Sequence, residues 1–161
     1  MRYIVEARFW ERGEDFHVCD HDGRPVFRVE GMAFSWGDKL SFQDLKQQEL
    51  AFISQKLLSW MPRFRIYRDG TLVVEVLKES SWHRRRFTLD LPGPSAYSID
   101  GSFWLHDYRF RRHGRVVARV GMTRAPRADT YGVEIEAGED DVSILCAAIV
   151  VDEVLHDGHY A

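Results

Sequence analysis

The sequence EDDVSILCAAIVVD, residues 139–152, constrains the architecture more than any other segment of the chain. Ser143 is the only polar side chain in residues 142–151, so a helix here has no polar face to turn toward water and must be buried on all sides. The acids at its start suit the positive end of a helix dipole, and Asp140 is a candidate N-cap. A buried strand is the alternative because valine and isoleucine abound, but an alanine pair and the length of the run favour a helix over residues 140–155.

A helix removed from water on every side needs a container, and a curled antiparallel sheet provides one. Upstream of the helix, short segments alternate between apolar and polar residues, and turn signals such as Asp22-Gly23, Asp69-Gly70 and His113-Gly114 separate them. We therefore expect a mainly β fold in a single domain over residues 1–161. About twelve strands are expected, near residues 2–10, 15–20, 25–34, 38–44, 49–59, 62–68, 71–78, 85–91, 96–101, 107–112, 115–121 and 131–136.

Composition bounds the class of protein. A length of 161 residues is enough for one domain with a substantial core, and 45% hydrophobic against 29% charged residues excludes a disordered chain. The net charge of −3 gives no overall attraction to nucleic acid, so no nucleic-acid partner is expected. The charge is nevertheless uneven, because seven arginines and no acid lie between Tyr108 and Ala128, whereas acids dominate from Asp129 to Asp157.

The cysteines and the apolar runs indicate the compartment. Two cysteines, Cys19 and Cys146, are too few for a disulfide framework, so we expect free thiols in a reducing environment. The chain starts at once with strand-like sequence, and its longest apolar run, residues 142–151, is about half of the roughly 20 residues that a membrane span needs. We expect no signal peptide, no transmembrane segment, and a cytoplasmic protein that is either free or peripheral at a membrane.

Three of the expected hairpins look alike, with aromatic residues before the turn and valines after it: residues 16–29, 64–76 and 108–120. An internal repeat and ordinary hairpin chemistry both explain the likeness. In the third hairpin, a three-residue loop at 112–114 keeps apolar and charged side chains on separate faces, so we prefer it to a two-residue loop. The outer face of that hairpin would then carry Arg109, Arg111, Arg115, Val117 and Arg119.

Five segments, in this order along the chain, resemble the LURP-one-related family, which is grouped with tubby C-terminal domains and phospholipid scramblases. They are DHDGRPVFRVEGMAFSWGDKLSFQD, ELAFISQKLLSWMPRFRIYRDGTLVVEV, FTLDLPG, IDGSFW and DTYGVEIEAGEDDVSILCAAIVVDEV, and together they span nearly the whole chain. The resemblance implies a closed antiparallel β-barrel of twelve strands around a central hydrophobic C-terminal helix, which agrees with the strands and helix counted above.

The resemblance also implies a class of function. Tubby C-terminal domains bind phosphoinositides and scramblases act at membranes, so a peripheral binder of anionic phospholipid, without enzymatic activity, is the function it implies. No local motif here matches the lipid-contacting residues of tubby, so no residue role is carried over. The extra N-terminal sequence and the calcium-binding segment of scramblases are missing, so lipid scrambling is not expected.

Two basic surfaces are candidates for binding lipid phosphates, where each Lys or Arg is worth about 1 kcal/mol near an anionic membrane. The first is the outer face of the third hairpin, and the second is the run 83–86 beside Trp82. The candidate residues are Arg109, Arg111, Arg115, Arg119, Arg84, Arg85 and Arg86. The alternative is that these arginines form a solvated barrel exterior and pair with acids on neighbouring strands.

No sequence signature of catalysis or of a metal site is present. There is no Gly-x-Ser-x-Gly, no phosphate-binding glycine loop and no Cys-x-x-Cys or His-Glu-x-x-His, and a helix that fills a barrel leaves no room for substrate. The acidic residues 139–141 lack the spaced ligands of a calcium loop, so helix capping is their expected role. We expect no enzyme, cofactor or metal, and the alternative to lipid binding is a protein–protein interaction or scaffold domain.

Overall fold

The computed structural model describes residues 1–10, 13–31, 39–56, 63–81, 84–90, 97–123 and 130–156. The fold is mainly β with one C-terminal helix, as predicted. The strands are β1 Arg2–Trp10, β2 Gly13–Asp20, β3 Pro25–Gly31, β4 Lys39–Asp44, β5 Glu49–Gln55, β6 Arg63–Arg68, β7 Thr71–Ser81, β8 Arg84–Asp90, β9 Tyr97–Ser102, β10 Asp107–Arg112, β11 Arg115–Met122 and β12 Thr130–Ile135. A short 3-10 helix, η1 Phe103–Leu105, precedes β10, and α1 spans Asp141–His156. The predicted strand ends at 32–34, 38, 57–59, 62, 91 and 96 lie outside the described residues.

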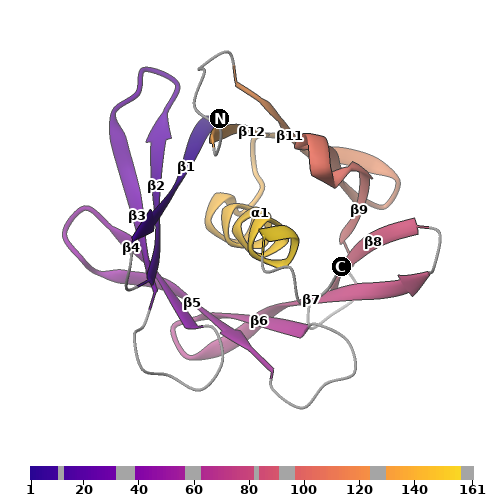
Figure 1. Cartoon of the computed structure of the whole chain (residues 1–161), viewed down its shortest axis with the longest axis horizontal. Helices are drawn as coiled ribbons and strands as arrows, with labels where there is room; N and C mark the ends of the chain where they lie inside the picture. Colours follow the sequence, from indigo (N-terminus) through magenta and orange to yellow (C-terminus); the bar gives the residue numbers. More distant parts are fainter. Residues whose placement is uncertain are drawn as a thin grey trace.

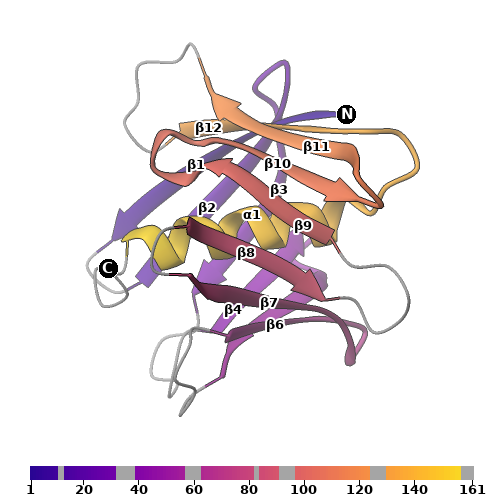
Figure 2. The ribbon, with the colours of Figure 1, turned by 90° about the vertical axis from the view of Figure 1, so that its right-hand side faces the viewer.

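The strands pair antiparallel with their sequence neighbours, and β1 pairs with both β2 and β12. The hydrogen-bonded order β1-β12-β11-β10-β9-β8-β7-β6-β5-β4-β3-β2 therefore returns to its start and forms a barrel. Figure 1 shows the ring of strands from one end, with α1 in its centre. Figure 2 shows from the side that strands pass both in front of the helix and behind it.

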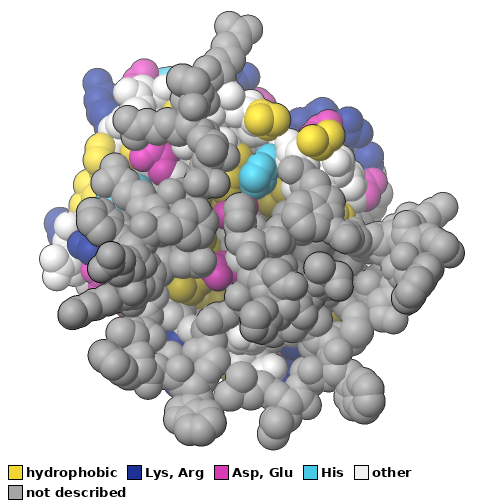
Figure 3. All heavy atoms as spheres, viewed as in Figure 1, with side chains coloured by type: hydrophobic (Ala, Val, Ile, Leu, Met, Phe, Trp, Pro, Cys, Tyr) yellow, Lys and Arg dark blue, Asp and Glu magenta, His cyan; other side chains and the backbone are white. Residues whose placement is uncertain are grey.

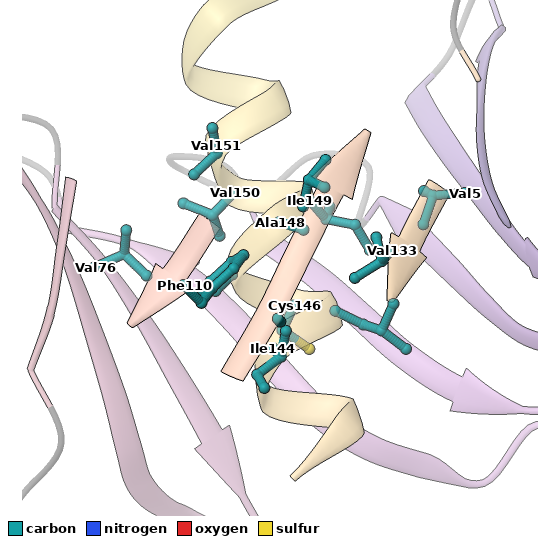
Figure 4. Packing of buried hydrophobic residues seen from close by; sticks show 14 of the residues in the cluster. Val5, Val76, Phe110, Val133, Ile144, Cys146, Ala148, Ile149, Val150 and Val151 are labelled. Atoms are coloured by element: carbon teal, nitrogen blue, oxygen red, sulfur yellow. The ribbon is translucent and has the colours of Figure 1, made fainter. Parts of the chain in front are cut away.

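The core consists of α1 and the inward-facing side of the strands. From Ile144 to Val151 every side chain is buried, with exposed fractions of 2% or less. Figure 4 shows these helix residues pointing outward in several directions toward strand residues such as Val5, Phe110 and Val133. The absence of a polar face in the sequence is thus matched by burial all round the helix.

The turn of the β10–β11 hairpin differs from the prediction. Both His113 and Gly114 have positive φ, of 51° and 77°, so the turn has two residues rather than three. Phe110 pairs with Ala118 and Arg111 with Val116, which leaves Val117 as an extra residue in a β-bulge. The bulge separates apolar from charged residues without a longer loop, and Val117, which was expected outside, is buried.

The same bulge recurs in the other two hairpins that looked alike in sequence. Val73 is the extra residue after the Asp69-Gly70 turn, and Val26 is the extra residue in the β2–β3 hairpin. The β4–β5 hairpin, which is not one of the three hairpins with similar sequences, has an equivalent bulge at Leu50. Val26, Leu50 and Val73 pack against the core, so each bulge turns an additional apolar side chain inward.

Candidate functional site

The four arginines of the third hairpin lie on its outer face, as expected. Arg109, Arg115 and Arg119 are exposed and Arg111 is half-buried. They do not form one cluster, however. Arg111 donates hydrogen bonds to the Asp100 carboxylate, at 3.2 Å, and to the Gly114 carbonyl.

Arg109 and Arg119 are the two that the structure brings together, because they are direct partners across the β10–β11 ladder. Arg115 instead pairs with Arg112 beside the turn. Like charges directly opposite each other on a sheet are destabilising. A pair of facing arginines therefore favours the arrival of an anion.

The acids flanking this arginine pair are already engaged. Asp100 is the strand partner of Arg109 but binds Arg111, and Glu134 is the strand partner of Arg119 but forms an ion pair with Arg2 at 3.3 Å. Within the described part of the chain, neither Arg109 nor Arg119 forms an ion pair with a carboxylate. Two positive charges thus face solvent, and none of the described acids forms an ion pair with either of them.

A hollow of about 560 Å³ lies beside this pair on the outside of the barrel. Its lining includes Arg2, Arg109, Arg119, Gly121, Met122 and Gly132. Gly121 and Gly132 are direct partners between β11 and β12, so the floor carries no side chains at that point. A Cβ atom added at Gly121 would meet nothing within 4 Å, which shows that the space above the backbone is open.

The second basic candidate can be placed only in part. Arg84, Arg85 and Arg86 begin β8 and pair with the end of β7. Their side chains, together with Trp82 and His83, lie outside the described part of the structure.

The acids at the start of α1 tie the helix to the barrel wall. Glu139 accepts hydrogen bonds from Tyr97, at 2.8 Å, and from Arg112. Asp140 accepts them from Arg68, at 2.9 Å, and from the Ser143 hydroxyl. Burial, followed by the hydrogen bond to Glu139, raises the pKa of Tyr97 to about 12.

Among the described residues no group of three or more histidine, cysteine or acidic side chains is arranged to hold a metal ion.

A buried polar cluster lies at the other end of α1 and was not found in the sequence. The His106 ring is 2.9 Å from the Asp152 carboxylate and stacks on the Tyr131 ring at 4.9 Å. The hydroxyls of Tyr108 and Tyr131 have no hydrogen-bond partner in the described structure, and burial raises the pKa of both tyrosines. The only signal available in sequence was an acid placed directly after a long apolar run.

A second hollow, of about 530 Å³, lies over β4, β5 and β6. It combines the aromatic pair Phe52 and Tyr67, whose centroids are 6.4 Å apart, with Lys39, Glu49 and Asp69. Charges of both signs line this hollow, and the same is true of the first hollow, where Asp107 and Glu134 lie beside Arg2, Arg109 and Arg119. No helix in the described part of the chain is long and apolar enough to span a membrane.

Comparison with known proteins gives one consistent result. A sequence model of the LURP-one-related family matches residues 1–152. The uncharacterized protein YxjI of Bacillus subtilis is 32% identical over 157 residues, which cover 98% of this chain and 95% of YxjI. An X-ray structure of an Arabidopsis thaliana protein has the same fold, with a TM-score of 0.70 at 16% identity, and the match covers 96% of this chain and 92% of that protein.

Proposed function

The chain belongs to the LURP-one-related family, and on that premise we propose that it is a non-enzymatic module that binds the headgroups of anionic phospholipids. The proposed site is the hollow between β10, β11, β12 and β1. Its proposed location is the cytoplasmic surface of a membrane, a reducing compartment in which the buried thiol of Cys146 stays unoxidised. The helix that fills the barrel supports a non-enzymatic role, since a barrel enzyme needs that interior for its substrate.

The observation that carries the proposal is the facing pair Arg109 and Arg119. A charge-assisted bond from arginine to a phosphate oxygen is about twice as strong as a neutral hydrogen bond, and a single phosphate can accept from both guanidinium groups. Neutralising the two charges at once also relieves their mutual repulsion. Other arginines nearby, Arg2 and Arg111, already hold acids and contribute less.

The glycine pair gives the site its shape. Because Gly121 and Gly132 carry no side chains, a phosphate or its substituent can approach the sheet beside Arg119. Ile4, the strand partner of Gly132 on β1, extends the floor with an apolar surface. A phospholipid has an anionic headgroup that the arginines can bind and an apolar part that can contact the apolar floor.

Liposome co-sedimentation tests the proposal. Wild type is compared on neutral vesicles and on vesicles with phosphatidylserine or phosphoinositide, at low and moderate salt. The site variant is Arg109→Gln/Arg119→Gln, and the control is Arg115→Gln/Lys46→Gln, which removes the same charge from exposed positions away from the hollow.

We expect salt-sensitive binding to anionic vesicles that the site variant loses and the control keeps. An equal loss of vesicle binding in both variants would show that general charge attraction causes the binding, and would contradict the proposed site. Failure of wild type to bind any vesicle would overturn the proposal. The alternative, a protein-interaction module using the mixed surface around Phe52 and Tyr67, would then take its place.

A further inference from the structure

We infer that the barrel docks on the membrane with one end down, so that Leu105 and Met122 insert among the lipids while Arg109 and Arg119 hold headgroups. The inference rests on the proposed lipid binding and adds an orientation and an apolar contact to it. Leu105 is 63% exposed and Met122 is 74% exposed. A single exposed apolar side chain is common on a protein surface, but several close together indicate an interaction site.

The two side chains gather because of the strand register. The β10–β11 ladder ends at Tyr108 and Val120, so His106, two residues before Tyr108, and Met122, two residues after Val120, both lie just beyond that end of the ladder. An independent contact agrees, since the His106 ring stacks on Tyr131, and Tyr131 is the strand partner of Met122. Leu105 precedes His106 directly, so both apolar side chains lie at the same end of the β10–β11–β12 wall.

The turn that carries Leu105 is held from inside. Phe103 is buried and packs on Tyr108, with ring centroids 5.2 Å apart. His106 has a positive φ of 46° and donates its backbone N–H to the Phe103 carbonyl, and its ring contacts Asp152 of α1. These contacts hold the turn without the side chain of Leu105, which faces solvent.

The spacing from the arginines suits a membrane surface. Met122 lies three residues beyond Arg119 on β11, which is about 10 Å along the strand at roughly 3.3 Å per residue, and about 7–8 Å along the axis of a barrel whose strands tilt by roughly 35–45°. The headgroup layer on each side of a bilayer is about 5–8 Å thick, since the whole bilayer measures roughly 40–45 Å and its hydrocarbon core roughly 30 Å. Arginines at phosphate level therefore place Met122 and Leu105 at the boundary of the acyl chains.

The space-filling view agrees with this arrangement. In Figure 3, exposed hydrophobic side chains lie beside lysine or arginine side chains at the upper right, over β11 and η1. Met122 also lines the same hollow as Arg109 and Arg119. Met122 projects from the inner face of β11, as Val120 does, whereas Arg119 projects from the outer face. The apolar pair thus lies at the rim of the barrel and the basic pair on the adjoining outer wall, and one lipid leaflet has matching apolar and polar layers.

The test compares Leu105→Ser/Met122→Ser with Leu45→Ser. Leu45 has the same exposed fraction as Leu105, 63%, but lies in the β4–β5 turn, away from the hollow. Insertion is measured as the maximum surface pressure at which the protein still enters an anionic lipid monolayer, and affinity as vesicle binding at moderate salt, where the apolar contribution persists.

We expect the double variant to enter the monolayer only at lower pressure and to bind vesicles roughly tenfold more weakly, because burial of two apolar side chains is lost. Leu45→Ser should behave as wild type, and thermal melts of all variants should coincide with that of wild type. Unchanged insertion by the double variant, with lipid binding by wild type intact, would overturn end-down docking alone. Absence of vesicle binding by wild type would overturn both the docking and the proposed function.

Discussion

Tyr3 on β1 donates its hydroxyl hydrogen bond to the carboxylate of Asp141, the first residue of α1. The contact joins positions 138 residues apart in sequence and links the first strand to the last element. Arg68 of β6 and Tyr97 of β9 hold the two preceding acids in the same way. The start of the helix is therefore fixed to widely separated parts of the barrel wall, and its acids are structural.

Tyr3→Phe should lower the free energy of unfolding by about 1–3 kcal/mol, because a hydrogen bond to a charged acceptor is lost in a partly buried position. Urea unfolding followed by far-ultraviolet circular dichroism measures it. Tyr67→Phe is the control, since Tyr67 makes a ring contact with Phe52 that phenylalanine retains. Equal stability of Tyr3→Phe and Tyr67→Phe would contradict a structural role for the Asp141 contact.

Loss of the central helix should abolish folding. A chain that ends at Glu139 lacks α1, so the inner surface of the barrel would be exposed to water, and we expect no cooperative thermal transition. In the full chain, Ala148→Asp places an unpaired charge at a fully buried position and should cost more than about 4 kcal/mol. Ser98→Asp, on an exposed position of β9, is the control. A truncated protein that melts cooperatively would refute the dependence of the barrel on its helix.

His113→Asn should stabilise the protein. His113 occupies the first position of a two-residue turn with φ of 51°, where asparagine is preferred before glycine. The expected gain is about 0.5–1 kcal/mol, seen as a higher melting temperature. The same change at His21, which is exposed and is not among the positive-φ residues described, should have little effect. A lower melting temperature for His113→Asn would contradict the turn assignment.

Stability should fall in alkaline solution. The pKa of Tyr97 is raised from 10.0 to about 12 in the folded protein, so the neutral phenol is favoured by folding. This contribution is complete below pH 10.0, the value for an unperturbed tyrosine, and is lost as the pH rises toward about 12. Unfolding free energies measured across this range should fall less steeply for Tyr97→Phe. An unchanged slope in that variant would show that Tyr97 does not contribute.

Much of the fold was predictable because the decisive patterns are local. Apolar alternation and turn residues located the strands to within a few residues, and the apolar run after Glu139 located α1. The hairpin loop was predicted wrongly for a local reason as well. The three-residue loop was preferred because a regular ladder was assumed. The bulge at Val117 makes the ladder irregular, so a two-residue turn also keeps apolar and charged side chains on separate faces.

The candidate site was predictable only in its residue types. That the arginines of β10 and β11 face outward follows from the alternation of side chains along a strand. Which of them lack an acid does not follow, because Asp100 and Glu134 come from strands whose register is set by the whole sheet. The sequence also does not predict that Gly121 and Gly132 are strand partners or that His106 contacts Asp152, because both depend on the register of the whole sheet.

The order of elements, the buried helix and the outward arginines are thus properties of short stretches of sequence, because hydrophobic periodicity and turn chemistry act over a few residues. The pairing of Arg109 with Arg119, the open floor beside them and the exposure of Leu105 next to Met122 are properties of the assembled barrel. They arise because the strand register brings residues that are distant in sequence to adjacent places on one surface, and a shift of register by one residue would separate them.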